Sequence, residues 1–161
     1  MCDMSLEIER KFLLLGQEFK QEAYDRVEIR QGYLSLSPER TVRVRARGDK
    51  GFLTIKGRSS DDGLSREEWE REIPLAEAEE LLAGCRAVVE KTRYLVRVGC
   101  HTFEVDEFHG SNEGLLLAEV ELTSPDEAFE RPAWLGREVT GEKAYYNSQI
   151  ALRTLKKEVE R

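Results

Sequence analysis

A regular alternation of charged and apolar residues runs through most of the chain and constrains its fold more than any other feature. The clearest example is TVRVRAR at 41–47, where three arginines alternate with two valines and an alanine. Successive side chains of a β-strand point to opposite faces, so this pattern predicts a strand with one charged and one apolar face. SLEIERKFLL near the N-terminus follows the same rule. Glu7, Glu9 and Lys11 share its charged face, and Arg10, which breaks the parity, is expected on the outer face.

Similar segments recur along the chain and predict about eight strands. Short connections such as GDKG favour antiparallel hairpins, because glycine and aspartate tolerate tight turns. Three segments break the period: PLAEAEELLAG predicts a helix, SPDEAFERPAWLG a short helix and a loop, and the tail at about 143–161 a C-terminal helix. We therefore expect a single domain over 1–161 with an α+β, mainly antiparallel fold. So many strands in one sheet favour closure into an eight-stranded barrel with helices packed outside.

The charged faces allow two interpretations. For any single strand, a solvated face opposite an apolar core is the simpler explanation. If helices cover the apolar outside of a closed barrel, however, the charged faces must line its lumen, where unpaired charge needs water, metal or ligand. Arginine and lysine side chains at such positions suit phosphate oxygens. Two E-x-E pairs, Glu7/Glu9 and Glu119/Glu121, offer the hard oxygen ligands that Mg²⁺ or Mn²⁺ accepts.

Composition narrows the classes of partner. The chain has 161 residues, enough for one domain with a real core, and 35% of them are charged. A net charge of −7 argues against general nucleic-acid binding. Three cysteines without close spacing predict neither a disulfide framework nor a zinc site. No secretory signal or membrane-spanning apolar run is visible, so we expect a cytoplasmic protein without a membrane partner, and the sequence leaves a homodimer open.

The ordered motifs resemble a known family. EIERKF matches the E-x-E-x-K signature of the CYTH, or triphosphate tunnel metalloenzyme, superfamily, and RQGYLS, RTVRVRARGDKGFLTIKG, LSREEWEREI, VEKTRY, FEVDEF, LAEVEL and PAWLGREVTGEKAYYN resemble blocks of its short bacterial branch in the same order. The resemblance implies a barrel that binds a small-molecule triphosphate in its tunnel with a divalent metal, Mg²⁺ or Mn²⁺. It implies metal ligation by Glu7, Glu9, Glu119 and Glu121, and phosphate binding by Lys11, Arg43, Arg45, Lys56, Arg66, Lys91 and Arg93.

The resemblance also implies a catalytic set: Tyr33, Glu68, Glu70 and Asp106. Tyr33 matches a tyrosine treated as a proton acceptor, although packing with a hydrogen-bonded hydroxyl would explain it equally well. Arg47, at the end of its strand, is expected to be solvated. The implied reaction is hydrolysis of inorganic tripolyphosphate to pyrophosphate and phosphate. Alternatives are a class IV-type adenylate cyclase, a thiamine or nucleoside triphosphatase, and a non-catalytic polyphosphate-binding module.

Overall fold

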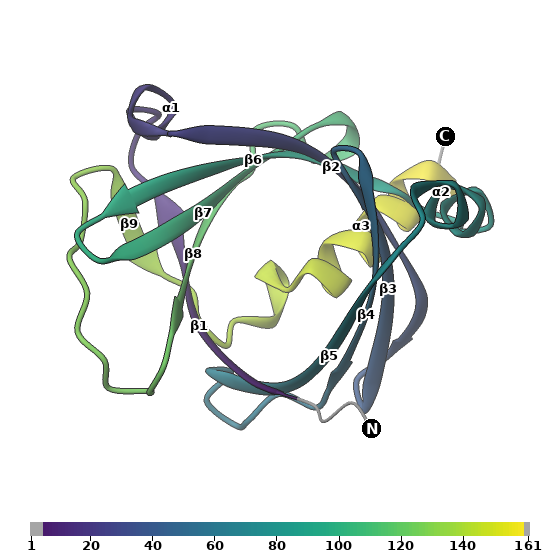
Figure 1. The fold of residues 1–161 in the computed structure, drawn as a ribbon, viewed down its shortest axis with the longest axis horizontal. Helices are drawn as coiled ribbons and strands as arrows, with labels where there is room; N and C mark the ends of the chain where they lie inside the picture. Colours follow the sequence, from purple (N-terminus) through teal and green to yellow (C-terminus); the bar gives the residue numbers. More distant parts are fainter. Residues whose placement is uncertain (1–4, 160–161) are drawn as a thin grey trace.

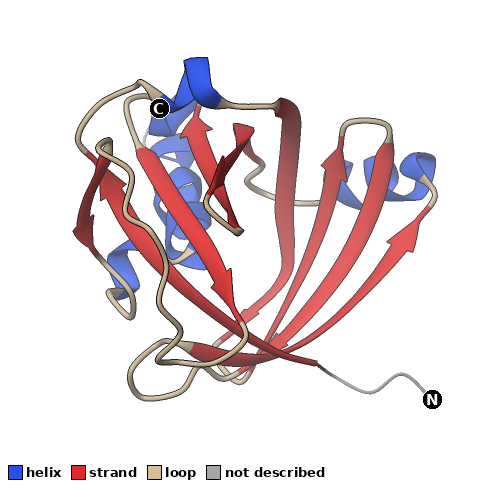
Figure 2. Cartoon of the chain, turned by 60° about the vertical axis from the view of Figure 1, so that its left-hand side comes forward, coloured by secondary structure: helices blue, strands red, loops and turns tan. Residues whose placement is uncertain are grey.

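The computed structural model describes residues 5–159, and a ring of antiparallel strands dominates it (Figure 1; Figure 2). The elements, in chain order, are β1 (Ser5–Leu14), α1 (Phe19–Glu22), β2 (Asp25–Ser37), β3 (Arg40–Arg47), β4 (Lys50–Gly57), β5 (Ser65–Ile73), α2 (Leu75–Ala83), β6 (Val89–Val98), β7 (His101–Phe108), the 3-10 turn η1 (Gly110–Asn112), β8 (Leu116–Leu122), β9 (Leu135–Glu138), the 3-10 turn η2 (Lys143–Tyr145) and α3 (Asn147–Val159).

The first strand closes the ring. The strand order is β5-β4-β3-β2-β6-β7-β8-β1-β9, and β5 pairs with β1 as well. The beginning of β1 pairs with β5, and the segment from Ile8 to Phe12 pairs with β8. The predicted closed barrel of eight strands is therefore confirmed. β9 is an additional short strand on the far end of β1, next to Phe12 and Leu14.

Two antiparallel runs, β2 to β5 and β6 to β8, make up most of the ring; two-residue turns join β2 to β3, β3 to β4 and β6 to β7, and longer connections lead into β5 and β8. The hairpin predicted at GDKG is confirmed, because Arg47 pairs with Lys50 across it. Gly48 in this turn has φ = 58°, a conformation that glycine adopts without steric cost. The two-residue turns and the strand pairing keep neighbouring strands in register, so that side chains of one parity face the lumen.

The apolar faces of the strands point outward and are covered by other segments. The larger outer cluster includes Phe12 and Phe103 and is covered by Phe19 of α1 and by Trp134, all four almost fully buried. α2 covers a second cluster on β3 through Ala78 and Leu82. Burying a large apolar side chain stabilises the fold by roughly 1.5–3 kcal/mol. Arg10 also lies outside, where it donates hydrogen bonds to Glu138 of β9.

The helix expected in SPDEAFERPAWLG is absent, and this prediction was wrong. Turns and irregular chain occupy 124–134, and β9 follows. Pro132 disfavours a helical conformation at Arg131. In the irregular segment, Phe129 packs edge-on against the rings of Phe12 and Phe103, at centroid distances of 5.8 and 6.0 Å. Such aromatic contacts stabilise this non-helical conformation.

The C-terminal helix lies across one end of the barrel, instead of against its outer wall as expected. Figure 1 shows the segment from η2 into α3 within the outline of the strand ring. Ile150 is fully buried against Val89, Phe108 and Leu117, which come from the inward parity of their strands. α3 runs over 147–159, a narrower range than the predicted 143–161, and residues 160–161 lie outside the described part. An apolar layer thus closes this end, and the first turn of α3 faces the polar interior.

Within residues 5–159, no helix combines the length and the hydropathy that crossing a membrane requires.

Candidate functional site

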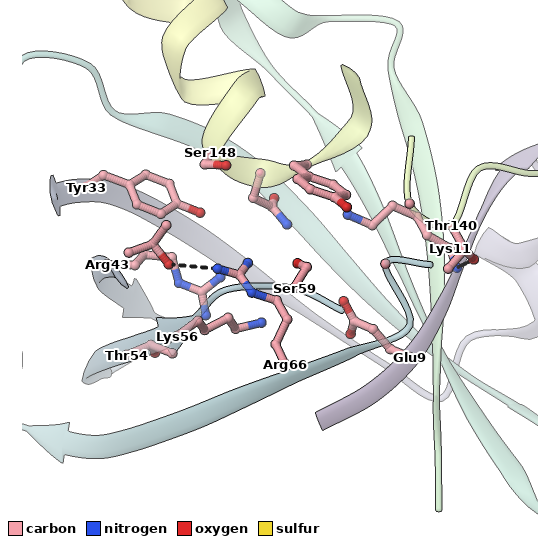
Figure 3. Close-up of a pocket in the computed structure, with 15 residues that line it drawn as sticks. Glu9, Lys11, Tyr33, Arg43, Thr54, Lys56, Ser59, Arg66, Thr140 and Ser148 are labelled. Atoms are coloured by element: carbon pink, nitrogen blue, oxygen red, sulfur yellow. Dashed lines mark hydrogen bonds between the residues drawn. The ribbon is translucent and has the colours of Figure 1, made fainter. Parts of the chain in front are cut away.

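The charged strand faces line the lumen, where two adjoining cavities meet. We call the first, with a volume of about 190 Å³, the acidic chamber; it is lined by Glu7, Glu9, Arg43, Arg45, Arg47, Lys56, Glu68, Glu70, Arg93, Glu104, Glu119, Glu121 and Asn147. We call the second, of about 60 Å³, the cationic chamber; it is lined by Glu9, Lys11, Tyr33, Thr41, Arg43, Thr54, Lys56, Ser59, Gly63, Arg66, Thr140, Gly141, Tyr146, Asn147 and Ser148 (Figure 3). Every predicted site residue lines one of them, with the exception of Lys91 and Asp106.

Carboxylates of β1 and β8 face one another at the seam of the barrel. In the strand register Glu9 lies opposite Glu121. Burial, followed by the negative charges of Glu119 and Glu7, raises the pKa of Glu9 well above its usual value. Burial together with Glu7 and Glu104 also raises the pKa of Glu121. These carboxylates repel one another in their charged form, and a cation placed among them would relieve the repulsion.

Lys56 neutralises part of this acidic surface. Its Nζ lies 2.8 Å from Oε1 of Glu7 and 3.4 Å from Oε2 of Glu68. Burial, together with the hydrogen bond and charge of Glu7, raises the pKa of Glu68 to about 7. Thr54 donates a 2.6 Å hydrogen bond to Glu70, which fixes that carboxylate on the neighbouring inward position. Glu68 is therefore a carboxylate that can exchange a proton near neutral pH inside the chamber.

Glu119 differs from the other acidic residues at the seam because cations surround it. Lys11 Nζ lies 3.5 Å from its Oε1. Burial favours the neutral acid, but the charges of Lys11 and Arg93 prevail and lower the pKa of Glu119 to about 2. Lys11 also donates a 3.0 Å hydrogen bond to the Tyr145 carbonyl, which connects β1 to the segment before α3.

A buried ion network stands behind the chamber wall. Asp106 lies 2.7 Å from Lys91 Nζ and accepts hydrogen bonds of 2.8 and 2.9 Å from Arg93. Burial opposes ionisation, but these two cations hold the pKa of Asp106 far below its usual range. Burial lowers the pKa of Lys91 to about 8, against the opposing effect of Asp106. Asp106 thus orients Arg93, which reaches the chamber and also pairs with Glu104 at 2.5 Å.

Two lumen arginines have no acidic partner. Among the described residues, no carboxylate oxygen lies within 4 Å of the guanidinium of Arg43 or Arg66. Arg66 donates to the Gly57 carbonyl, and the buried Nε atoms of Arg43 and Arg45 have no hydrogen-bond partner in the described structure. Burial and then the charges of Arg43 and Arg93 lower the pKa of Arg45 to about 9. This surplus of buried positive charge favours an anionic ligand.

Tyr33 reaches the cationic chamber from β2. It lies opposite Arg43 in the pairing of β2 with β3, and Figure 3 shows its hydroxyl directed into the cavity. This position is compatible with either role that the sequence left open for Tyr33.

Three residues that line the chambers were not among the predicted site residues. Arg47, expected in solvent, lines the acidic chamber, and so does Glu104. Both share the inward parity of their neighbours Arg45 and Asp106, so the alternation alone could have found them. Asn147 lines both chambers, and its side-chain oxygen lies 3.2 Å from Lys91 Nζ. No strand periodicity could locate Asn147, because it belongs to α3.

The candidate ligands for a divalent metal ion are the seam carboxylates Glu7, Glu9, Glu119 and Glu121. In the described residues, no three acidic, histidine or cysteine side chains converge closely enough to hold an ion as they stand. Glu7 is engaged by Lys56 and Glu119 by Lys11. Hard carboxylate oxygens are nevertheless the ligands that Mg²⁺ and Mn²⁺ prefer, and the mutual repulsion at Glu9 is what a cation would relieve. The donor set fits such an ion, which would compete with the lysines for these oxygens.

The chain is similar to known proteins over most of its length. The model of the CYTH domain matches residues 5–154. An inorganic triphosphatase from Acetivibrio thermocellus is 47% identical over 149 residues, which cover 91% of this chain and 94% of that protein. An inorganic triphosphatase from Nitrosomonas europaea is 40% identical over 151 residues, covering 91% and 97%. A solved inorganic triphosphatase superposes with a TM-score of 0.63 at 36% identity, covering 91% of this chain and 94% of the other. A structure from Pyrococcus horikoshii at 22% identity, covering 74% and 80%, shares the fold (TM-score 0.60).

Proposed function

The chain belongs to the CYTH domain family, and on this premise we propose that it is a metal-dependent inorganic triphosphatase that cleaves tripolyphosphate into pyrophosphate and phosphate. Two relatives of nearly the same length, at 47% and 40% identity, are inorganic triphosphatases. The observation that carries the proposal is the pairing of two opposite excesses of charge in one lumen. Arg43 and Arg66 lack acidic partners, while the carboxylates of β1 and β8 repel one another. A triphosphate with a divalent metal satisfies both.

The cations of the lumen would bind and orient the substrate. Arginine forks can hold two phosphate oxygens each, whereas lysine acts as a point charge. Arg43, Lys56 and Arg66 would take the phosphate that lies in the cationic chamber. Arg45 and Arg93 would hold the phosphate nearer the acidic chamber, where Arg93 is kept in place from behind by Asp106. Phosphoryl transfer needs this positioning and charge neutralisation more than it needs covalent chemistry.

The family implies a divalent metal ion, and we assign it to the carboxylates at the seam. Glu7, Glu9, Glu119 and Glu121 would hold Mg²⁺ or Mn²⁺. When bound, such an ion polarises the phosphoryl group and makes a coordinated water more acidic. Glu119 is well suited to ligation because its low pKa keeps it charged at any physiological pH.

Among the predicted catalytic residues, Glu68 suits proton transfer best. It lines the acidic chamber and has a pKa of about 7, so it can accept a proton from the attacking water near neutral pH. Glu70, held by Thr54, would orient that water. Asp106 lies outside both chambers, and we reassign it to the positioning of Lys91 and Arg93. Tyr33 keeps its two candidate roles in the cationic chamber.

Phosphate release from tripolyphosphate, ATP and thiamine triphosphate tests the proposal, each with Mg²⁺, with Mn²⁺ and with a chelator. We expect metal-dependent release that is fastest with tripolyphosphate. Glu119→Gln should lower kcat by roughly a hundredfold or more through loss of a hard ligand. Glu113→Gln, which alters an exposed carboxylate outside the lumen, is the matched control and should leave it unchanged.

Other outcomes would select other functions. Cyclic AMP formed from ATP would identify a cyclase. A preference for ATP or thiamine triphosphate would reassign the substrate. Tripolyphosphate binding without turnover under any metal condition would leave a polyphosphate-binding module. The sequence allows a homodimer, and light scattering after gel filtration tests for one.

A further inference from the structure

We propose that the first turn of α3 is a phosphate subsite of the lumen, in which backbone N–H groups at Asn147, Ser148 and Gln149 bind the phosphate that lies in the cationic chamber. This inference rests on the proposed function, because it concerns the same anionic substrate. It assigns a binding role to the C-terminal helix, in addition to the strand cations that the charge pattern identified.

The beginning of α3 is a source of unused hydrogen-bond donors. The first N–H groups of an α-helix have no acceptor within the helix. Ile150 is the first residue of α3 whose N–H is bonded, to the Tyr146 carbonyl, and no acceptor in the described residues contacts the N–H groups of 147–149. The aligned peptide dipoles also place partial positive charge at this end, and no acidic residue in the first turn offsets it.

This helix end is directed into the cationic chamber. Tyr146, Asn147 and Ser148 all line that cavity. Figure 3 shows Ser148 across the cavity from Thr54 and Lys56. A phosphate held by the strand cations would therefore have the helix N-terminus on its other side, which is the geometry in which helix ends bind anions.

An independent observation points to an anion-binding site at this position. Arg43, which lines the same chamber, is only 9% exposed, and its Nε has no hydrogen-bond partner in the described structure. No carboxylate among the described residues pairs with Arg43 or with Arg66 on the neighbouring wall. Arg43 is therefore a buried guanidinium whose only side-chain hydrogen bond within residues 5–159 is one of 3.5 Å to the Thr54 hydroxyl. A buried charge without an opposite charge is costly, so a ligand anion is the natural partner for Arg43.

Packing holds the helix end in place before any ligand arrives. Ile150 is buried against the apolar layer that closes the barrel. The side-chain oxygen of Asn147 lies 3.2 Å from both Lys91 Nζ and Gln31 Nε2, and Lys11 holds the Tyr145 carbonyl at 3.0 Å. The N–H groups are thus preorganised, so that binding does not have to order them.

The direct test is to add tripolyphosphate to ¹⁵N-labelled full-length protein without metal, which prevents turnover. We expect the amide resonances of Ser148 and Gln149 to shift downfield and to saturate together with the Arg43 Nε resonance. Shifts at Arg43 without shifts at 148 and 149 would overturn the subsite and leave the proposed function standing. If none of these resonances moved, the subsite would also be overturned, and the metal-dependent release assay would still decide the proposed function.

A charge substitution gives a second readout. Ser148→Asp places a carboxylate at the second position of α3, where it favours the helix but repels phosphate. The matched control is Ala76→Asp, at the exposed second position of α2. We expect KM for tripolyphosphate to rise at least about tenfold in Ser148→Asp, from like-charge repulsion at close range, with an unchanged or higher Tm. A KM within about twofold of the control value would overturn the subsite.

Discussion

Replacing Asp106 with asparagine should destabilise the barrel by far more than a surface substitution would. The side chain of Asp106 is 3% exposed and contacts Lys91, which is 0% exposed, and Arg93, which is 8% exposed. Removing one member of a buried ion pair costs about 3–5 kcal/mol, because the remaining charge stays buried without its partner. At about 2–4 °C per kcal/mol for a domain of this size, Tm should fall by roughly 6–20 °C. Arg93 would still pair with Glu104 after the substitution, so most of the lost stability should come from the unpaired charge of Lys91.

The pH dependence of this defect follows from Lys91. Its pKa in the folded protein is about 8, below the ordinary 10.5. A base with a lowered folded pKa binds fewer protons when folded, so its contribution to the free energy of unfolding rises as pH increases between the two values. Without Asp106 the pKa of Lys91 falls further, and the deficit of Asp106→Asn should shrink between pH 7 and pH 9.

Thermal denaturation followed by circular dichroism at pH 7 and pH 9 measures the loss of stability in Asp106→Asn. Asp61→Asn, in an exposed loop, is the matched control and should melt like the unaltered protein. Adding Lys91→Met to Asp106→Asn removes the stranded charge and should recover part of the lost stability. The reasoning is refuted if Asp106→Asn melts within about 2 °C of the unaltered protein, or if the double variant is no more stable than the single one.

Three further predictions concern the lumen and its walls. Arg43→Ala should raise KM for tripolyphosphate roughly ten- to hundredfold through loss of charge-assisted hydrogen bonds. Steady-state kinetics that match those of the unaltered protein would show that Arg43 does not bind the substrate. The pKa of Glu119 is about 2 in the folded protein and 4.5 ordinarily, so its stabilising contribution is present above pH 4.5 and is lost as pH falls toward 2. In an acid titration, the free energy of unfolding should therefore decline less steeply in Glu119→Gln than in the unaltered protein. Identical curves would contradict this role of Glu119. Gly63→Ala should lower the free energy of unfolding by about 1–3 kcal/mol, because Gly63 has φ = 76° and an added Cβ would lie 2.3 Å from Gly141 Cα. An unchanged urea midpoint would show that the loops around Gly63 and Gly141 can move apart at no cost in stability.

Strand parity made much of the lumen predictable, because it is a local property of the sequence. Glu9, Lys11 and Arg43 face inward for the same reason that Phe12 faces outward. Depth along the barrel is a different matter, because it depends on the stagger between strands. Asp106 shares the parity of the other lumen acids, but the pairing of β6 with β7 places it beside two buried cations. Parity therefore identified its face without revealing its role.

The location of the C-terminal helix could not be read from its apolar stripe. The pattern around Ile150 indicates a helix that buries one face, and it does not indicate which surface receives that face. Here the receiving surface is the inside of the barrel, formed by Val89, Phe108 and Leu117 from three separate strands. Only the closed ring brings these residues together. Asn147 and the chamber wall formed by α3 were missed for that reason.

The seam at β1 has a consequence for how the protein is made. Ile8–Phe12 pair with β8, and Arg10 bonds Glu138, 128 positions further along the chain. During synthesis, β1 is therefore made first but cannot pair with β8 and β9 until nearly the whole chain has emerged from the ribosome. Until then its open edge is available to other chains, which is the condition that favours aggregation of slow-folding β-proteins. A chain that stops before residue 116 lacks β8 altogether and cannot close the ring.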